Sequence, residues 1–422
     1  MDVHLRRGTS SAFDNLQCSV LLSVSLLTNI MTSTWPVSPL YLSVCNVSKG
    51  LATASLVTYF QDFNRVFSNS EYEGPRYLST LHLGLAALHL QLSPPDSRTK
   101  CYVMYWAIIS LRPLMLRLVQ RFPQSFSFGE AALVSQAVLL SLSASVMSLL
   151  SLEKVSTRAL ALELAAKLNT LEEKFRSVEP AVVRLVTVWA GLVLLSLAVV
   201  ALYNSRRWVV TTRTRKVFHV AIVMVYISGL TWCPLLLLLA SLALLLLMLG
   251  LEALRVSQLF PPVSNFLTEK LRRFTDEKDG GALILTNIYL LVGMSLPLWL
   301  DPSLTITSHY HAQPAHFTLY SGLLSVGVFD TVAAVVGSWL GRTRWTITSS
   351  RTLEGSLAGL LLTLATVFLL GRLTGVVLPS GANILISSCL VMICEALSSQ
   401  VDNLCLPLVM LISTNICTLL GI

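Results

Sequence analysis

The stretch PLLLLLASLALLLLMLGL (residues 234–251) decides the fold class. It carries no charged residue, and an α-helix needs about 20 consecutive apolar residues to cross a bilayer. A second stretch, LVTVWAGLVLLSLAVVALY (185–203), has the same character. Across all 422 residues, 54% are hydrophobic and only 12% are charged, whereas soluble domains carry roughly 25% charged residues. The sequence therefore predicts an all-α protein, a polytopic bundle of transmembrane helices.

Apolar runs of this kind are most regular after residue 100. Each has the length and the low charge that are typical of a membrane span. Before residue 100, the apolar runs are short and are interrupted by polar residues. The predicted spans are 102–120, 131–152, 181–203, 218–231, 233–254, 282–300, 319–340, 356–372, 378–395 and 404–421.

These patterns predict three regions along the chain. Residues 1–100 form a poorly defined N-terminal membrane-associated region, 101–203 hold N-terminal transmembrane helices, and 204–422 form a C-terminal polytopic membrane domain. Within the second region, segment 153–180 has apolar residues at helical spacing and many charges. This combination predicts an amphipathic helix on the membrane surface.

Basic residues collect in three loops between the predicted spans. Loops 204–217, 255–281 and 341–354 are rich in Lys and Arg, whereas loop 301–318 has neither. The order of the spans puts the three basic loops on one face, and the positive-inside rule makes that face cytosolic. The net charge of +8 is interpreted in the same way, as a property of cytosolic loops and not as a sign of nucleic-acid binding.

An aspartate lies inside the otherwise apolar stretch VGVFDTVAAVVGSWLGRTRW (326–345). Asp330 shares a helix face with Ala334, Gly337 and Gly341, and small residues let helices approach closely. This pattern predicts that Asp330 faces the inside of the bundle. Ionisable residues at such depth are usually functional, here as a carboxylate that binds a metal or handles a proton. The structural alternative is an ion pair with a buried Arg or Lys.

The segment that follows, GRTRWTITSSRTLEG (341–355), combines three arginines with several hydroxyl side chains and the start of a helix. Such groups bind polyphosphates. A basic loop that touches anionic lipid explains the same composition, so both interpretations stay open. Lys216 and His219, at the entry to another span, are either further site residues or a snorkelling lysine and an interfacial histidine.

Two more acids lie near the C-terminus. Glu395 and Asp402 are seven residues apart and share a face if one helix continues through both. The chain contains no GxxxxGK[ST], protein-kinase, HExxH or GxSxG motif. Phosphate chemistry in this protein would therefore use a different scaffold.

At these residues the chain resembles the dolichol kinase family, the CTP-dependent polyprenol kinases of the endoplasmic reticulum. The resembling segments are RKVFHV (215–220), the stretch 266–300, YSGLLSVGVFDTVAAVVGSWLGRTRW (320–345), RTLEGS (351–356) and SSQVDNLCLPLVMLI (398–412). The family favours Gly before the aspartate, where this chain has Phe329. It favours a Lys-Lys-Thr stretch, where this chain has Ser350, Arg351 and Thr352.

The resemblance implies transfer of the γ-phosphoryl group of CTP to dolichol, with Mg²⁺ as cofactor. The product, dolichyl phosphate, serves protein N-glycosylation and related mannosylation. The site would face the cytosol from a multi-pass protein of the endoplasmic reticulum membrane. The implied catalytic residues are Asp330, which also holds the metal, Lys216 and His219; the implied nucleotide-binding residues are Gly341, Arg344, Ser349, Ser350, Arg351, Thr352, Glu354 and Gly355, with Glu354 ordering the loop.

Two alternatives to this function stay open. Phytol kinases and phosphatidate cytidylyltransferases are related membrane enzymes that also use CTP. In a different class, a transporter would place Asp330 in its transport pathway, although the chain shows no internal repeat of the kind that many transporters have. The expected partners are CTP, dolichol and the lipid bilayer, with a homo-oligomer also considered.

Overall fold

The computed structural model describes residues 12–33, 37–67, 98–122, 125–153, 165, 169, 179–205, 212–272, 281–301, 316–346, 351–398 and 400–422. All regular elements in these residues are helices, which confirms the all-α prediction. Among these described residues, seven helices are long and apolar enough to cross a membrane. The predicted amphipathic segment 153–180 lies almost entirely outside the described residues, as do Ser349 and Ser350.

The chain forms two compact units. One contains residues 1–164 and 276–284, and the other contains 165–275 and 285–422. The domain boundaries predicted at residues 100 and 203 stay predictions.

The first unit contains two helices within the region that the sequence left poorly defined. Serines and threonines interrupt the apolar runs there, and several of their hydroxyl groups form hydrogen bonds within the protein. The Ser23 hydroxyl, for example, donates to the Ser48 carbonyl at 2.8 Å. One of the two helices contains the stretch Pro39–Thr58, which is long and apolar enough to span a membrane. The helices are α1 (Ala12–Thr32), α2 (Pro39–Phe67), α4 (Arg98–Arg121) and α5 (Phe128–Glu153).

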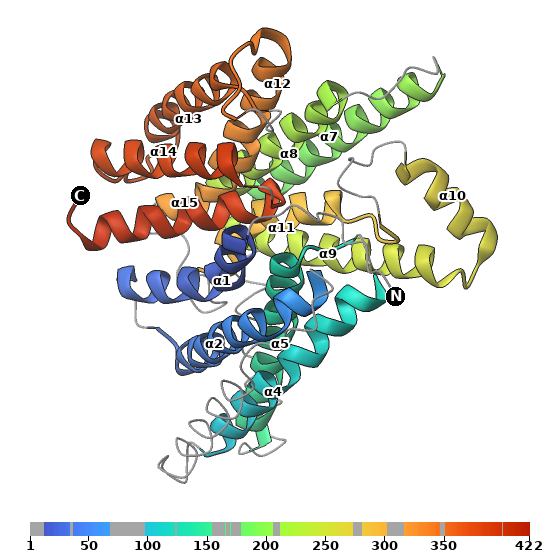
Figure 1. Ribbon diagram of the computed structural model, residues 1–422. Helices are drawn as coiled ribbons and strands as arrows, with labels where there is room; N and C mark the ends of the chain where they lie inside the picture. The colour runs from blue at the N-terminus through green and yellow to red at the C-terminus, as the bar shows by residue number, and fades with distance from the viewer. Residues whose placement is uncertain are drawn as a thin grey trace. The chain divides into compact units, whose positions relative to one another are not determined.

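The second unit contains the predicted C-terminal spans, and each of them falls on helical residues. Its elements are α7 (Glu179–Ser205), α8 (Thr212–Trp232), α9 (Pro234–Ser257), α10 (Pro261–Arg272), α11 (Thr286–Trp299), η2 (Phe317–Tyr320), η3 (Leu323–Asp330), α12 (Thr331–Leu340), α13 (Leu353–Thr374), α14 (Gly381–Leu397) and α15 (Asp402–Leu419). Figure 1 shows α13, α14 and α15 packed next to one another.

Two elements of this unit differ from the sequence prediction. The span predicted at 282–300 is the 14-residue helix α11, which at 1.5 Å per residue is shorter than the hydrocarbon core. Its residues pack against α9, α15 and η3. The loop predicted at 255–281 contains helix α10, of 12 residues.

Segment η3 forms the centre of the second unit. It is a π-helix of eight residues, all of them buried. It packs against α8, α11, α13 and α15. The approach to α11 is close, because a Cβ at Gly322 would lie 2.5 Å from the Gly293 carbonyl oxygen. The core around η3 includes Tyr320, Leu323 and Phe329, which are fully enclosed.

The π-helix ends at Asp330. Thr331 begins α12, and its hydroxyl donates to the carbonyl of Val326, five residues earlier, at 3.2 Å. π-Helical turns inside helices are rare and are frequent at functional sites. The widened π-helical turn therefore lies directly before α12 and ends at Asp330, the buried acid that the sequence analysis identified.

Small residues join α12 to α13, as the glycine pattern predicts. A Cβ at Gly355 would lie 2.5 Å from the Ala333 carbonyl oxygen and 2.9 Å from the Gly337 Cα. Phe329, which occupies the position where the family favours Gly, packs against Gly359 of α13. The two helices can approach this closely only because side chains are absent at the contact.

Candidate functional site

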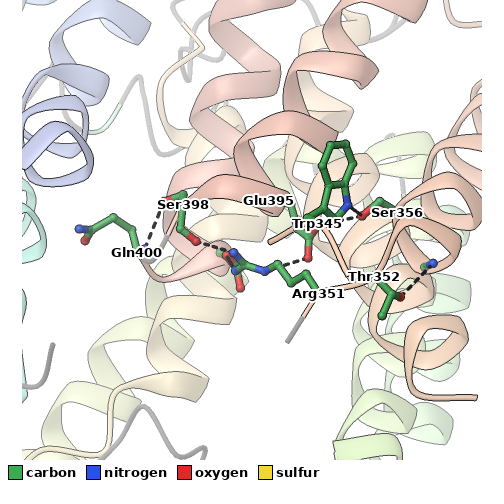
Figure 2. Close-up of polar contacts among 9 residues, drawn as sticks. Trp345, Arg351, Thr352, Ser356, Glu395, Ser398 and Gln400 are labelled. Carbon is green, nitrogen blue, oxygen red and sulfur yellow. Dashed lines mark hydrogen bonds and ion pairs between the residues drawn. The ribbon is translucent and has the colours of Figure 1, made fainter. Parts of the chain in front are cut away.

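Arg351 lies directly before α13 and is the centre of a polar cluster. Its Nε is 3.0 Å from Glu395 Oε1, and its Nη2 is 2.6 Å from Asp402 Oδ1. Its Nη1 donates to the Ser398 carbonyl. Figure 2 shows the guanidinium between Glu395 and Ser398. All three guanidinium nitrogens therefore have oxygen acceptors from the protein.

The two acids reach Arg351 from different helices. Glu395 is in the last turn of α14, and Asp402 is the first residue of α15. The condition that one helix continues through both acids is not met, because the backbone becomes extended at Ser398. The turn between the helices brings both carboxylates to one guanidinium.

A third carboxylate contributes to the charge at this cluster. Burial alone would lower the pKa of Arg351, but the negative charges of Asp402, Glu395 and Asp330 outweigh it and raise the pKa. Asp330 is 9% exposed, on the central helix of the unit. One positive charge thus lies among three acidic side chains, so the cluster is an acidic environment when all of them are ionised.

A chain of hydrogen bonds extends the cluster to the loop before α13. The Trp345 indole N–H donates to the Ser356 hydroxyl at 3.0 Å. That hydroxyl donates to Glu395 Oε2 at 3.3 Å. Both Glu395 oxygens are therefore engaged, one by Arg351 and one by Ser356, and the carboxylate has a defined orientation (Figure 2).

The described ends of loop 341–354 pair with each other. The Leu353 amide donates to the Thr343 carbonyl at 2.9 Å, and the Trp345 amide donates to the Arg351 carbonyl at 3.2 Å. The Glu354 carboxylate accepts the Thr343 amide N–H, with Oε1 at 3.0 Å. Through this hydrogen bond Glu354 holds the start of loop 341–354 in place, as expected of a residue that orders the loop.

Thr352 begins α13 as its N-cap. Its hydroxyl accepts the Gly355 amide N–H at 3.3 Å. The same side chain contacts α12, because a Cβ at Gly337 would lie 2.9 Å from the Thr352 hydroxyl oxygen. A capped N-terminus presents its remaining amide groups to an anion.

The structure changes the interpretation of one predicted nucleotide-binding residue. The sequence predicts that Arg351 cradles phosphates, but its guanidinium binds two carboxylates and a carbonyl. An arginine engaged in this way holds protein groups in position. Arg344 differs, because its side chain is exposed.

The predicted residues Lys216 and His219 lie in α8, which packs against η3 and α12. The His219 side chain is buried, and the side chain of Lys216 lies outside the described residues. Four residues beyond His219, Val223 faces Gly327 of η3, where an added Cβ would lie 2.6 Å from it. Helix α8 therefore packs directly against η3, the segment that carries Asp330. The roles of Lys216 and His219 stay predictions.

Trp345 and Ser356 were not predicted as site residues. The only sequence signal for them is their position in the two segments that resemble the family. Their contact spans 11 residues across a loop, and no local periodicity encodes it.

The described residues contain no group of three or more His, Cys, Asp or Glu side chains placed to hold a metal ion. Mg²⁺ in nucleotide sites is usually bound by one or two carboxylates together with phosphate oxygens and water. The carboxylates of Asp330, Glu395 and Asp402 are oxygen donors of the type that Mg²⁺ prefers. The donor set is therefore compatible with Mg²⁺ that arrives with a nucleotide.

The fold and the cluster define a polytopic helical membrane protein with a buried charged site where several helices meet. Residues 96–402 match the family model for dolichol kinase. The chain therefore belongs to the dolichol kinase family. The match includes Asp330, Arg351, Glu395 and Asp402.

Individual relatives support the assignment to this family. The chain is 37% identical to dolichol kinase of Mus musculus over 216 residues, which are 50% of this chain and 39% of the mouse protein. It is 36% identical to dolichol kinase of Homo sapiens over 242 residues, 54% of this chain and 44% of the human protein. It is 31% identical to dolichol kinase EVAN of Arabidopsis thaliana over 199 residues, 46% of this chain and 33% of that protein. The chain thus spans less than half the length of these curated relatives, and no solved structure matches it.

Proposed function

We propose that this chain is a CTP-dependent dolichol kinase, which transfers the γ-phosphoryl group of CTP to the terminal hydroxyl of dolichol. One observation supports this function above the others: the Arg351 cluster joins the helix start of α13 to two acids from α14 and α15, with Asp330 contributing charge nearby. Every one of these residues lies within the segment that matches the dolichol kinase family.

The reaction forms one bond and breaks one bond at phosphorus. The dolichol hydroxyl oxygen attacks the γ-phosphorus, and the bond from that phosphorus to the β,γ-bridging oxygen breaks. CDP leaves with the electron pair, and the hydroxyl proton passes to a base. Such transfers depend on positioning and charge neutralisation more than on covalent chemistry. A site held by a network of ion pairs and a capped helix suits this requirement.

We assign the direct catalytic role in phosphoryl transfer to the carboxylate of Asp330. It is buried at the end of the central π-helix, directly before α12. In this position it would bind the cation that accompanies the nucleotide or accept the hydroxyl proton. His219 and Lys216, from the neighbouring helix α8, are the proposed residues of the opposite wall.

The nucleotide phosphates are assigned to the start of α13 and the loop before it. Thr352 caps this helix, and Glu354 holds the loop through the Thr343 amide. The exposed Arg344 supplies a cation at the loop. In this proposal Arg351 acts as a positioning residue for Glu395 and Asp402, so it supports the phosphate site without contacting it. Gly341, Ser349, Ser350 and Gly355 complete the proposed phosphate-binding segment.

Mg²⁺ is the proposed cofactor, held by Asp330 together with the nucleotide phosphates. When bound, it would neutralise negative charge on the transferring phosphoryl group. The protein groups around it would orient the nucleotide. Arg351 would hold the carboxylates of Glu395 and Asp402 in place through its ion pairs.

The lipid substrate would reach this site from the bilayer. The proposed location is the membrane of the endoplasmic reticulum, with loop 341–354 facing the cytosol, where CTP is available. Dolichyl phosphate made there would serve protein N-glycosylation and related mannosylation. The basic loops on this face support the orientation.

The position of the radiolabel in the lipid product tests this function. The purified chain in vesicles that contain dolichol is incubated in parallel with CTP labelled at the γ-phosphate and with CTP labelled at the α-phosphate. A dolichol kinase transfers only the γ-label to lipid. Lipid that carries the α-label would show cytidylyl transfer, and vesicles with phytol in place of dolichol separate the two alcohol substrates.

A further inference from the structure

We propose that helix α10 (Pro261–Arg272) lies flat on the surface of the bilayer and is a membrane-surface anchor of the second unit. Nothing in the proposed kinase reaction uses this helix. It replaces part of what the sequence predicts to be a simple loop. Figure 1 shows it next to the end of α9 and apart from the other helices of its unit.

The position of α10 along the chain places it at the membrane surface. Helix α9 is a candidate span that ends at Ser257. The chain then turns at Gln258, which has a left-handed backbone with φ of 53°. Helix α10 begins three residues later. A helix that follows the end of a span after so short a turn begins at the level of the lipid headgroups.

One side of α10 is held against α9 by a specific contact. The Ser264 hydroxyl donates to the Leu254 carbonyl at 3.0 Å, and Ser264 is fully buried. This hydrogen bond satisfies a carbonyl near the C-terminus of α9. The rotation of α10 about its own axis is therefore fixed, which determines the side chains that point away from α9.

A row of large apolar side chains on α10 is exposed. Phe260, Val263 and Phe266 recur at a spacing of three residues, and Phe266 is 58% exposed. Leu259, just before the helix, is 70% exposed. Single exposed apolar side chains are ordinary, but a contiguous row of this kind marks an interaction surface. Leucines of the α9 span, such as Leu246, are exposed as well.

The described charged side chains of α10 lie at the edge of the apolar row and pair with each other, with Lys270 Nζ 3.2 Å from Glu269 Oε1. Lys270 lies over the Phe266 ring, 5.5 Å from its centroid, so its stem follows the apolar row while its ammonium reaches beyond it. Asn265 is two residues from Val263, and therefore lies across the helix from it, and is exposed. An apolar row flanked by charged side chains, with a polar residue across the helix, is typical of helices that lie in the membrane interface.

Photo-crosslinking in vesicles tests this proposal without using kinase activity, so it is independent of the proposed function. Benzoylphenylalanine, which resembles phenylalanine in shape, replaces Val263 or Phe266 in the full chain, reconstituted in vesicles of phosphatidylcholine and phosphatidylserine. Asn265 is the matched control position on the same helix, and Leu246 is the reference position within the span. Mass spectrometry identifies the adducts after irradiation.

The expected result is that the Val263 and Phe266 positions form lipid adducts, as Leu246 does, whereas the Asn265 position forms few. Adducts to peptides of this chain, or of a second copy, would show that protein covers the row and would overturn the proposal. The absence of adducts at Val263 and Phe266, with lipid adducts at Leu246, would place the row in water and would overturn it equally.

Discussion

Nη2 of Arg351 lies 2.6 Å from Oδ1 of Asp402, although the two residues are 51 positions apart in the chain. The same guanidinium binds Glu395 and the Ser398 carbonyl. One side chain thus connects the start of α13 with the end of α14 and the start of α15. This arrangement makes Arg351 a residue that organises the site, and the first prediction follows from it.

Replacing Arg351 by alanine leaves two partly or fully buried carboxylates without their cation. Removal of one partner from a buried ion pair is strongly destabilising, and we expect a loss of about 3 kcal/mol. Thermal unfolding of the solubilised protein measures it. Arg344→Ala is the matched control, because the Arg344 side chain is exposed; its stability should change by less than about 0.5 kcal/mol. If the two variants melted at the same temperature, the organising role of Arg351 would be wrong.

The packing of α12 on α13 gives a second prediction. Gly355→Ala should destabilise the protein by about 1–3 kcal/mol, the usual result of overpacking, because the new methyl group would lie 2.5 Å from the Ala333 carbonyl oxygen. Gly250→Ala is the control, since nothing lies within 4 Å of a Cβ at that position in α9. Equal thermal stability of the two variants would mean that α12 and α13 are not in close contact.

The helices of the second unit could be predicted because each apolar run carries its own signal. The small residues after Asp330 likewise predicted a close helix contact. The cluster around Arg351 could not be predicted, because its partners come from two later helices and a break between them. Helix α10 was missed for a different reason: the charges near its end made the segment resemble a loop, and its apolar row has a spacing of three residues over a single short helix.

The cap of α13 links local structure to nucleotide binding. Thr352→Ala removes the hydroxyl that accepts the Gly355 amide N–H, which typically costs about 1 kcal/mol. If the phosphates bind at this helix start, the KM for CTP should rise by roughly fivefold, while the KM for dolichol stays unchanged. Thr352→Ser keeps the acceptor and should restore the KM for CTP. A change confined to the KM for dolichol would place the nucleotide elsewhere.

The orientation of the loop before α13 is a fourth prediction. Thr346 is exposed, and a cysteine introduced there should react with a membrane-impermeant maleimide in intact microsomes. Six of the eight native cysteines are buried, so the background should be low. A cysteine that reacts only after detergent is added would put the loop in the lumen, where it could not meet cytosolic CTP.

The most direct test of the account is γ-phosphoryl transfer by the Asp330→Asn variant. The substitution keeps the size of the side chain and removes the charge that a cation or a proton requires. In vesicles with dolichol and γ-labelled CTP, the variant should form dolichyl phosphate at least about 100-fold more slowly than the wild-type chain, while its thermal stability and membrane insertion stay unchanged. A well-folded Asp330→Asn variant that formed dolichyl phosphate at the wild-type rate would contradict the assignment of the reaction to this site.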